Sequence, residues 1–570
     1  LKNYIHTMAL MEHNAPWAIL FNNDAFIAKQ GTLMGRHAAG SAYLRALANE
    51  GYKECAILTR NNYERQNFIN LFKSFLSEKK IDLNLLPWDR PDLSKEYGGI
   101  FLGDPQLGNH SVLRSNFGHN KYSIVGITHT TMSKGIMDFL ADIIYKPVQE
   151  WDSLICTSKC VKDTVDEVLQ FYKDDLSDRL GAKKFTIPKL PIIPLGVHLN
   201  DFEFSQNQKT EIRDKFGINK NDICLIFVGR LSFHAKAHYF PMYKALQEVS
   251  KELDKKRTIH LIQVGWFAND FIEKQYKEDA KLICPDIKCH FVDGLDQNQK
   301  NLILSASDIF ISLTDNYQET FGLTPIEAMA AGIPALVTDW NGYKDTVRDN
   351  IDGFTVPTIA LKSGSSIDLL YQYYSNIINY DQYIGYASQR VAVDIDVTIR
   401  KLKEMILNDS LRKEMGKHGK ERAKSNFSWS VVLDQYNDLR LSLDDIRVSN
   451  NNKIYQRSYI EVLDPSNIFK SYPTLSLSDD LSLFSKTEIL DKENYLFNSD
   501  SINLSKDYNS FDPELYKLKP DFDIINQIIV LLNKNKLKVS DLHKKIDIDN
   551  DQIDKVIVIM LKFDLIGLCD

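Results

Sequence analysis

The sequence has no hydrophobic run long enough to cross a membrane. No stretch of its 570 residues approaches the roughly 20 consecutive apolar residues that a bilayer-spanning helix needs. The first residues, LKNYIHTMAL, also lack the basic and then apolar layout of a secretory signal peptide. We therefore expect a cytoplasmic protein without a transmembrane segment. Peripheral attachment to a membrane surface stays open, although no strongly basic amphipathic helix favours it.

Paired cysteines and excess basic charge are also lacking. The seven cysteines are an odd number scattered along the chain, which favours reduced thiols over a disulfide framework. The closest approach to a metal pattern, Cys156-x-x-x-Cys160, has no second pair, so we predict no metal site and no cofactor. A net charge of -7 at pH 7 argues against a nucleic-acid partner.

The composition is that of a globular α/β protein of more than one domain. Hydrophobic residues make up 44% of the chain and charged residues 25%. The length leaves room for two α/β domains of ordinary size and an extension.

The segment ETFGLTPIEAMAAGIP, residues 319–334, holds two carboxylates eight positions apart around a predicted strand-to-helix turn. The apolar run at 308–314 predicts a buried strand, and the helical spacing from Pro325 predicts a helix. We therefore expect Glu319 in the loop and Glu327 in the first helical turn. Exposed backbone N–H groups of residues 321–323, beside a helix N-terminus, would favour a phosphate.

The same segment has a simpler interpretation. Thr324-Pro325-Ile326-Glu327 has the pattern of a capping box with proline at the first helical position. That interpretation explains Glu327 but leaves Glu319 and Phe321-Gly322, which we expect to be exposed, without a role.

A second charged cluster follows the apolar run ICLIFV at 223–228. Gly229 and Arg230 end this predicted strand, and Lys236 lies six residues after the arginine. Two cations beside a glycine suit a diphosphate, because the charges and the backbone can approach it together. A solvated loop is the alternative for an isolated Arg and Lys.

The N-terminal half repeats the α/β rhythm with weaker signals. A predicted strand at 17–23 is followed by a loop that contains Gly35 and Arg36, and a second apolar strand ends at His129. A glycine before a helix is often just a turn, and a single histidine is often structural.

Together these motifs resemble the donor-binding signature of the retaining GT-B glycosyltransferases, specifically glycosyltransferase family 4 (glycosyl transferases group 1). The resemblance is strongest over about residues 220–357. It implies two Rossmann-like domains that face a cleft, with a mostly helical extension after them. In that family the first glutamate contacts the donor sugar and the second the ribose, which implies these roles for Glu319 and Glu327. The sequence differs in the offset of Lys236, six residues where five is common, and in Trp340-Asn341-Gly342, which replaces paired glycines.

The resemblance implies a full set of site residues. The predicted catalytic residues are Glu319, His129 and Arg230. The predicted donor-binding residues are Gly35, Arg36, Gly229, Arg230, Lys236, Glu319, Thr320, Phe321, Gly322, Leu323 and Glu327.

Four segments are expected along the chain. Residues 1–200 would form the acceptor-side domain, and residues 201–445 the donor-binding domain with a closing helix that packs back on the first. Residues 446–520 read as an irregular linker or arm, and residues 521–570 as a small helical, winged-helix-like module. An acidic charge balance favours a packing module, through which the chain would form a homo-oligomer, over a DNA-binding module.

The predicted activity is transfer of a sugar from a UDP- or GDP-linked donor to an acceptor hydroxyl, with retention of configuration and without a metal. The acceptor stays open among glycans, lipid-linked saccharides, proteins and small molecules. Two alternatives remain: another GT-B enzyme, such as a phosphorylase or epimerase, and a sugar-nucleotide sensor without activity.

Overall fold

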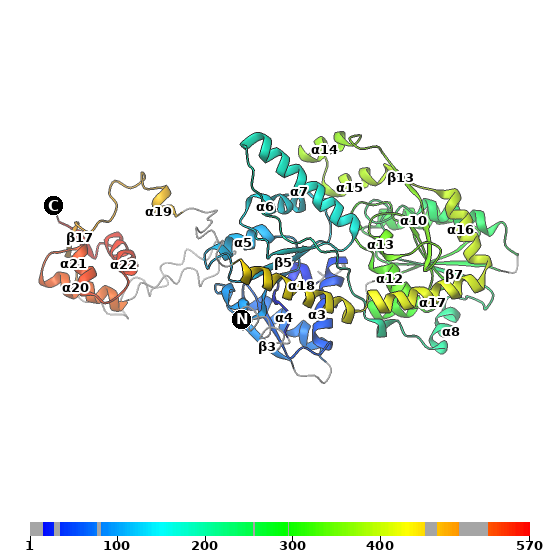
Figure 1. Ribbon diagram of the computed structural model, residues 1–570, viewed down its shortest axis with the longest axis horizontal. Coiled ribbons are helices and arrows are strands. Elements are labelled where there is room, and N and C mark those ends of the chain that lie inside the picture. The colour runs from blue at the N-terminus through cyan, green and yellow to red at the C-terminus, as the bar shows by residue number, and fades with distance from the viewer. Residues whose placement is uncertain are drawn as a thin grey trace. The chain divides into compact units, whose positions relative to one another are not determined.

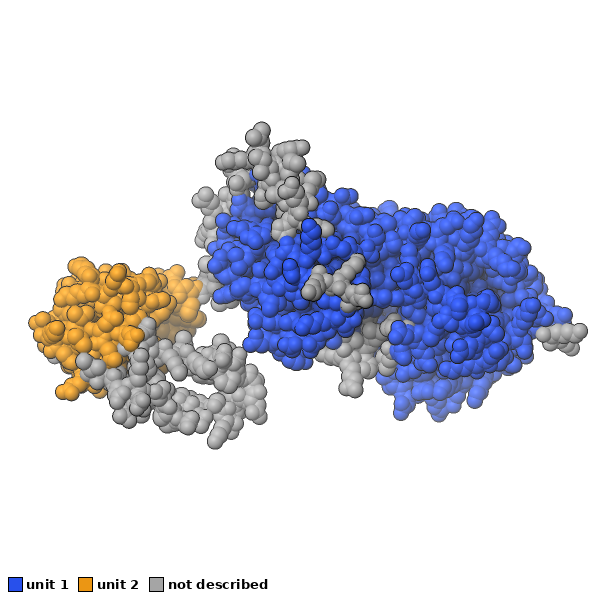
Figure 2. All heavy atoms as spheres, turned by 90° about the horizontal axis from the view of Figure 1, so that it is seen from below, with its two compact units in different colours: residues 1–459 blue, residues 460–570 orange. Residues whose placement is uncertain are grey.

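The computed structural model describes residues 15–27, 35–76, 81–254, 257–294, 296–450, 464–488 and 522–569. The chain divides into two compact units, Leu1–Tyr459 and Ile460–Asp570, which Figure 2 shows in different colours.

The first unit begins with a parallel six-stranded sheet whose order is β3-β2-β1-β4-β5-β6. Its strands are β1 (Ala18–Leu20), β2 (Glu54–Leu58), β3 (Asp82–Leu86), β4 (Gly99–Leu102), β5 (Ser123–Ile127) and β6 (Ser153–Ile155). Most are buried along their whole length, because helices cover both faces of a parallel sheet. The helical segments of this domain are α2 (Asn23–Phe26), α3 (Gly35–Asn49), α4 (Asn62–Phe75), η1 (Pro91–Tyr97), α5 (Leu107–Ser115), α6 (Lys134–Tyr145), α7 (Lys159–Leu180) and η2 (Leu199–Phe202).

A second parallel sheet follows, with the order β12-β11-β10-β7-β8-β9. Its strands are β7 (Ile223–Val228), β8 (Ile259–Val264), β9 (Lys288–Val292), β10 (Ile309–Ser312), β11 (Ala335–Thr338) and β12 (Gly353–Val356). The helices of this domain are α8 (Gln206–Lys215), α9 (Phe240–Ser250), α10 (Asp270–Ile283), α11 (Gln297–Leu304), α12 (Leu323–Ala330), α13 (Tyr343–Thr346), α16 (Ile395–Leu407) and α17 (Asp409–Asn426).

The two sheets share one topology. Counted from its own first strand, each sheet has the order 3-2-1-4-5-6 of a Rossmann fold. Two such domains within one compact unit form the GT-B fold, which confirms the predicted fold class (Figure 1).

The closing helix α18 (Trp429–Ser449) returns from the second domain to the first (Figure 1). The rings of Trp429 and Tyr436 lie 6.0 Å and 5.7 Å from the ring of Tyr43 in α3. Near the end of the helix, Arg447 donates hydrogen bonds to the carbonyl oxygens of residues 120 and 121. The helix therefore ties the two domains together, as the family resemblance implied.

An insertion lies between β12 and α16. It consists of the antiparallel strands β13 (Thr358–Ala360) and β14 (Val391–Val393), with helices α14 (Ile367–Tyr374) and α15 (Tyr380–Ser388) between them.

The second unit packs three helices against a small antiparallel sheet. Helices α20 (Phe522–Lys534), α21 (Val539–Lys545) and α22 (Asn550–Lys562) share a core with the strands β15 (Ser482–Ser485), β16 (Leu537–Lys538) and β17 (Ile566–Leu568). A short helix, α19 (Pro465–Ile468), precedes them. The sheet order is β16-β15-β17, so its central strand comes from the segment predicted to be an irregular arm. That expectation was wrong for β15, because a strand of four residues with one fully buried side chain, Leu483, leaves almost no periodic signal.

Within the described ranges, no helix is both long enough and apolar enough to span a membrane.

Candidate functional site

The candidate site lies where the strand order of the second sheet reverses. Strands β7 and β10 are neighbours there, although two strands and three helices separate them in the chain. In open parallel sheets, ligands bind outside the carboxyl ends of the strands at this point. The loops that leave β7 and β10 carry residues 229–236 and 313–322, which include most of the predicted donor-binding residues.

Lys236 and Glu319 form an ion pair across these two loops. The Lys236 ammonium donates to Oε2 of Glu319, and each side chain is 15% exposed. Burial lowers the pKa of Lys236, but the charge and hydrogen bond of Glu319, with a contribution from Tyr343, outweigh it, so the net pKa lies above the ordinary value. Lys236 is therefore charged at every physiological pH. Gly229 makes room for it, since a Cβ there would lie 3.1 Å from Cε of Lys236.

Arg230 lies half-buried beside this pair. Its guanidinium donates to the carbonyl oxygen of Ala235 over 3.1 Å, which anchors it to its own loop. Burial lowers its pKa, and the nearby Glu319 carboxylate acts in the opposite direction. Because a guanidinium carries five N–H donors, donors remain for a ligand.

The loop from Glu319 into α12 differs from the prediction in three respects. Phe321 is not exposed: it is 2% exposed and its ring lies 6.1 Å from that of Phe427. Helix α12 begins at Leu323 after a Gly322 cap, so Glu327 lies in the second turn. No side chain caps this helix, so the capping-box interpretation of Thr324 was also wrong. The predictions for Phe321, Thr324 and Glu327 relied on the spacing of neighbouring residues in the sequence. The start of the helix is instead set by the tertiary fold.

Gly322 is the point at which the loop turns. Its φ of 91° is in the left-handed region, and a Cβ there would lie 2.2 Å from the ring of Tyr343. Only glycine fits this conformation and this contact.

Glu327 is paired with a lysine that the sequence analysis did not identify. Lys300, on α11, donates to both carboxylate oxygens over 2.9 Å, and its side chain is 8% exposed. A lysine within a helical segment gives no signal of such a contact, because its partner lies 27 positions away.

The backbone of the Trp340-Asn341-Gly342 segment lies close to the backbone of the donor loop, although this segment lacks paired glycines. A Cβ at Gly342 would lie 2.3 Å from the carbonyl oxygen of Thr320. Asn341 takes a positive φ of 42°, which asparagine tolerates better than most residues.

Thr320 joins the donor loop to the first domain. Its hydroxyl donates to the backbone oxygen of His129 over 2.5 Å, and its own carbonyl accepts from the Ser158 hydroxyl over 2.6 Å. His129 is thereby brought next to the loop that carries Glu319.

The ring of His129 is neutral. Burial lowers its pKa to about 4, while a hydrogen bond from Nε2 to the Gly103 carbonyl, 3.0 Å long, works against that shift. Since a carbonyl can only accept, Nε2 must carry the proton, and Nδ1 is left as an acceptor.

Gly35 and Arg36 are the first two residues of α3. Arg36 forms an ion pair with Asp24 over 3.0 Å, and its charge helps to lower the pKa of His129. Gly35 has open space around it. Among the residues that the structure describes, no hydrogen bond or ion pair joins Gly35 or Arg36 to the Lys236–Glu319 pair.

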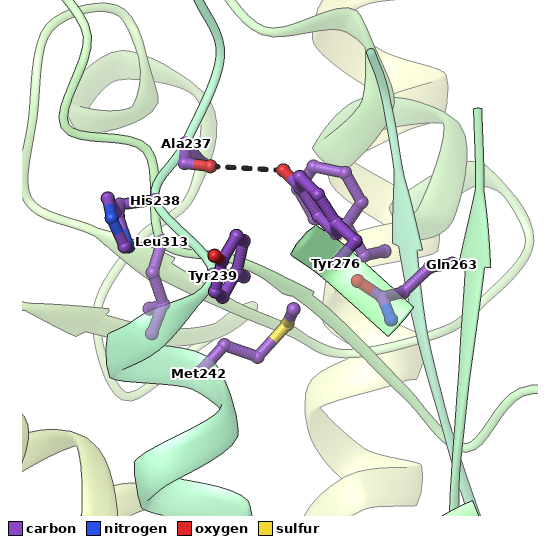
Figure 3. Close-up of a pocket in the computed structure, with 8 residues that line it drawn as sticks. Ala237, His238, Tyr239, Met242, Gln263, Tyr276 and Leu313 are labelled. Carbon is purple, nitrogen blue, oxygen red and sulfur yellow. Dashed lines mark hydrogen bonds between the residues drawn. The ribbon is translucent and has the colours of Figure 1, made fainter. Parts of the chain in front are cut away.

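A small cavity lies behind the loop that carries Lys236 (Figure 3). Its volume of about 10 Å³ is room for one water molecule, not for a nucleotide. Tyr276, which lines it, donates to the Ala237 carbonyl over 3.5 Å. The residues that line this cavity therefore hold the loop in place and do not form a ligand site.

Nearby, burial raises the pKa of Asp315 to about 7, and its carboxylate accepts from the His238 N–H over 3.3 Å.

Comparison with known proteins agrees with this geometry. Residues 208–367 match the family model described as Glycosyl transferases group 1. The chain is 23% identical to an uncharacterized glycosyltransferase of Methanocaldococcus jannaschii, over 66% of this chain and 80% of that protein. It is 28% identical to an Escherichia coli UDP-Gal:alpha-D-GlcNAc-diphosphoundecaprenol alpha-1,3-galactosyltransferase, over 30% of this chain and 41% of that protein.

A solved structure covers a larger share of this chain than these two related sequences do. The crystal structure of Anabaena HepE in complex with UDP covers 75% of this chain and 100% of its own, with 14% identity and a TM-score of 0.46. The family match lies within the second Rossmann-like domain, the domain that carries Arg230, Lys236 and Glu319.

Proposed function

We propose that the chain is a retaining glycosyltransferase of family 4, which transfers a sugar from a UDP- or GDP-linked donor to an acceptor hydroxyl. The observation that carries this proposal is the meeting of Arg230, Lys236 and Glu319 at the switch point of the second sheet. Two cations and a carboxylate match the diphosphate and the hydroxyl groups of a sugar nucleotide.

Each charged group of the site has a role in the proposed mechanism. Arg230 and Lys236 stabilise the negative charge that develops on the leaving diphosphate, the largest contribution expected in such a site. Glu319 accepts hydrogen bonds from the donor sugar, and its contact with Lys236 fixes both side chains before the donor binds. Glu327, held by Lys300, accepts from the ribose hydroxyls.

The two cations make a metal ion unnecessary for this charge stabilisation. In the proposed reaction the acceptor hydroxyl arrives on the face that the diphosphate leaves, which retains the configuration. The neutral His129 serves there as a hydrogen-bond partner through Nδ1 and not as a cation. Closure of the domains around the donor would exclude water.

The test is incubation of the full chain with a panel of UDP- and GDP-sugars, with and without acceptors and with and without EDTA. Release of nucleoside diphosphate and NMR of the product's anomeric proton give the activity and the stereochemistry. We expect release that EDTA does not abolish, and an unchanged anomeric configuration. Conversion of the sugar without release would indicate an epimerase, use of inorganic phosphate a phosphorylase, and binding without turnover a sensor.

A further inference from the structure

The α14–α15 insertion contacts loops of both domains at the candidate site. Its small core of Leu369, Ile378 and Ala387 packs against Met132, which follows His129 in the first domain. On the other side, Gly385 of α15 fits against His234, where a Cβ would lie 3.1 Å from the histidine Cβ. His234 belongs to the loop that carries Arg230 and Lys236. The insertion therefore lies against the loops that hold the proposed catalytic groups of each domain.

Tyr380, the first residue of α15, points a buried hydroxyl into this junction. The hydroxyl lies beside Thr130 but makes no hydrogen bond of ordinary geometry among the described residues. Burial raises its pKa to about 12, so it remains a neutral donor. Its ring lies 6.3 Å from that of Tyr373, which stacks on Tyr383 at 4.4 Å. The hydroxyl is thus held in place by packing, and a buried hydroxyl without a partner costs free energy until a partner arrives.

Arg230 belongs to the loop against which α15 packs, since that loop carries His234 beside Gly385. Burial lowers the pKa of Arg230, and three groups oppose that shift: Glu319, Asp381 next to Tyr380, and Tyr380 itself. The insertion therefore places a neutral hydrogen-bond donor against the loop whose guanidinium we assign to the diphosphate.

We propose that Tyr380 is a substrate-binding residue, whose hydroxyl donates a hydrogen bond to an oxygen of the sugar nucleotide held by Arg230. This inference rests on the proposed function. The oxygen belongs either to the diphosphate or to the donor sugar. Helix α15 lies beyond residue 367, where the family match ends.

The test compares Tyr380→Phe with Tyr386→Phe, a control on the same helix whose side chain is 41% exposed. Both variants keep the aromatic ring and lose one hydroxyl. For each protein we would measure the dissociation constants of UDP and GDP, those of the matching sugar nucleotides, and kcat/KM for transfer. We expect Tyr380→Phe to weaken binding and lower kcat/KM by about tenfold, the worth of one hydrogen bond, and Tyr386→Phe to match the wild type.

The two ligand classes identify the contacted oxygen. Equal loss for nucleoside diphosphate and sugar nucleotide indicates a diphosphate oxygen, and loss for the sugar nucleotide alone indicates a sugar hydroxyl. Thermal unfolding separates a structural role, since a lowered Tm with unchanged affinity and kcat/KM would mean that the hydroxyl serves only Thr130, which overturns the inference. Wild-type values throughout for Tyr380→Phe would also overturn it, while leaving the proposed function intact. If the wild type binds no nucleotide or sugar nucleotide, the proposed function fails and this inference fails with it.

Discussion

At the scale of single residues, charge pairing dominates the candidate site. Lys236 and Lys300 are both largely buried, and each has one carboxylate as its counter-charge, Glu319 and Glu327 respectively. Removing one partner of a buried pair leaves an uncompensated charge, which is far more costly than replacing both. Substitutions of the two glutamates therefore affect stability as well as function.

The two glutamates should differ in their kinetic effects. Glu319→Gln should lower kcat by about 100-fold or more, with a smaller change in UDP affinity, because its contacts strengthen as the sugar becomes cationic. Glu327→Gln should mainly weaken nucleotide binding, since the ribose contact is the same before and during the reaction. Steady-state kinetics and calorimetric titration with UDP check both variants. Wild-type values in both would refute these assignments.

Arg230 offers a graded test of the diphosphate site. Arg230→Ala should depress transfer by about two orders of magnitude or more, comparable to the loss of one preorganised donor. Arg230→Lys should restore part of the activity, because it keeps the charge but not the fork of N–H groups. Activity of the alanine variant near that of the wild type would exclude Arg230 from the site.

Asp315 should make stability depend on pH. Its folded pKa of about 7 lies above its ordinary value of 3.8, so the folded state holds a proton that the unfolded state releases between these limits. The resulting stabilisation is complete below pH 3.8 and is lost as pH rises through 7, by at most about 1.4 kcal/mol per pH unit.

Urea unfolding between pH 4 and pH 8 measures this dependence. The difference in unfolding free energy between Asp315→Asn and the wild type should shift in favour of the variant as pH rises. Asp339→Asn, at an exposed position after β11, is the control. Parallel pH profiles for the wild type and Asp315→Asn would contradict the burial argument.

Among the helices, α7 has an N-terminal cap that also contacts the donor loop. Ser158 caps the helix by accepting from the Val161 N–H over 3.3 Å, and its hydroxyl donates to the Thr320 carbonyl in the donor loop. Ser133 caps α6 in the same way, accepting from the Ile136 N–H over 3.4 Å, but within the described part of the chain its side chain makes no hydrogen bond to the second domain.

Replacing each of these capping serines by alanine gives a matched pair of variants. Ser158→Ala and Ser133→Ala should each cost about 1 kcal/mol of stability through the lost cap. Only Ser158→Ala should also change the KM for the donor, because it frees the loop that carries Glu319. Denaturant unfolding and donor kinetics distinguish the two effects, and equal KM values would mean that the bond between the domains has no role in donor binding.

Helices and strands were predictable from the sequence where a segment was long and its apolar residues were regularly spaced. The apolar runs that became β7 and β10 were clear, because a buried parallel strand is apolar on both sides. The start of α12 was placed wrongly, because Thr324 and Pro325 have the local signature of a helix start while the turn is made by Gly322.

At the scale of the whole molecule, the division into two units predicts a separable activity. The candidate site and its supporting contacts lie within residues 1–459. A chain that ends at residue 459 should keep kcat/KM within about twofold of the full chain, since distant sites are usually independent. Loss of activity on truncation would show that the second unit takes part in catalysis.

The second unit should not bind DNA in spite of its winged-helix-like architecture. Its helix α22 carries Asp551 and Asp554 among its polar residues, and phosphate neutralisation supplies most non-specific affinity. Mobility-shift assays with the full chain should detect no duplex binding at physiological salt, whereas its oligomeric state should change on truncation. Salt-sensitive submicromolar binding would instead favour the sensor hypothesis.

The two Rossmann-like domains were implied by the family resemblance, whereas the α/β class and the positions of Arg230, Glu319 and Glu327 in loops or helices after buried strands could be predicted from the residues. These features are local, because apolar periodicity and glycine turns act over a few residues. Three features of the site depend on the folded chain: Lys236 pairs with Glu319, 83 positions away, Lys300 binds Glu327, and Phe321 is buried. Such contacts depend on which strands become neighbours, and the crossover that places β7 beside β10 leaves no mark on the residues it brings together.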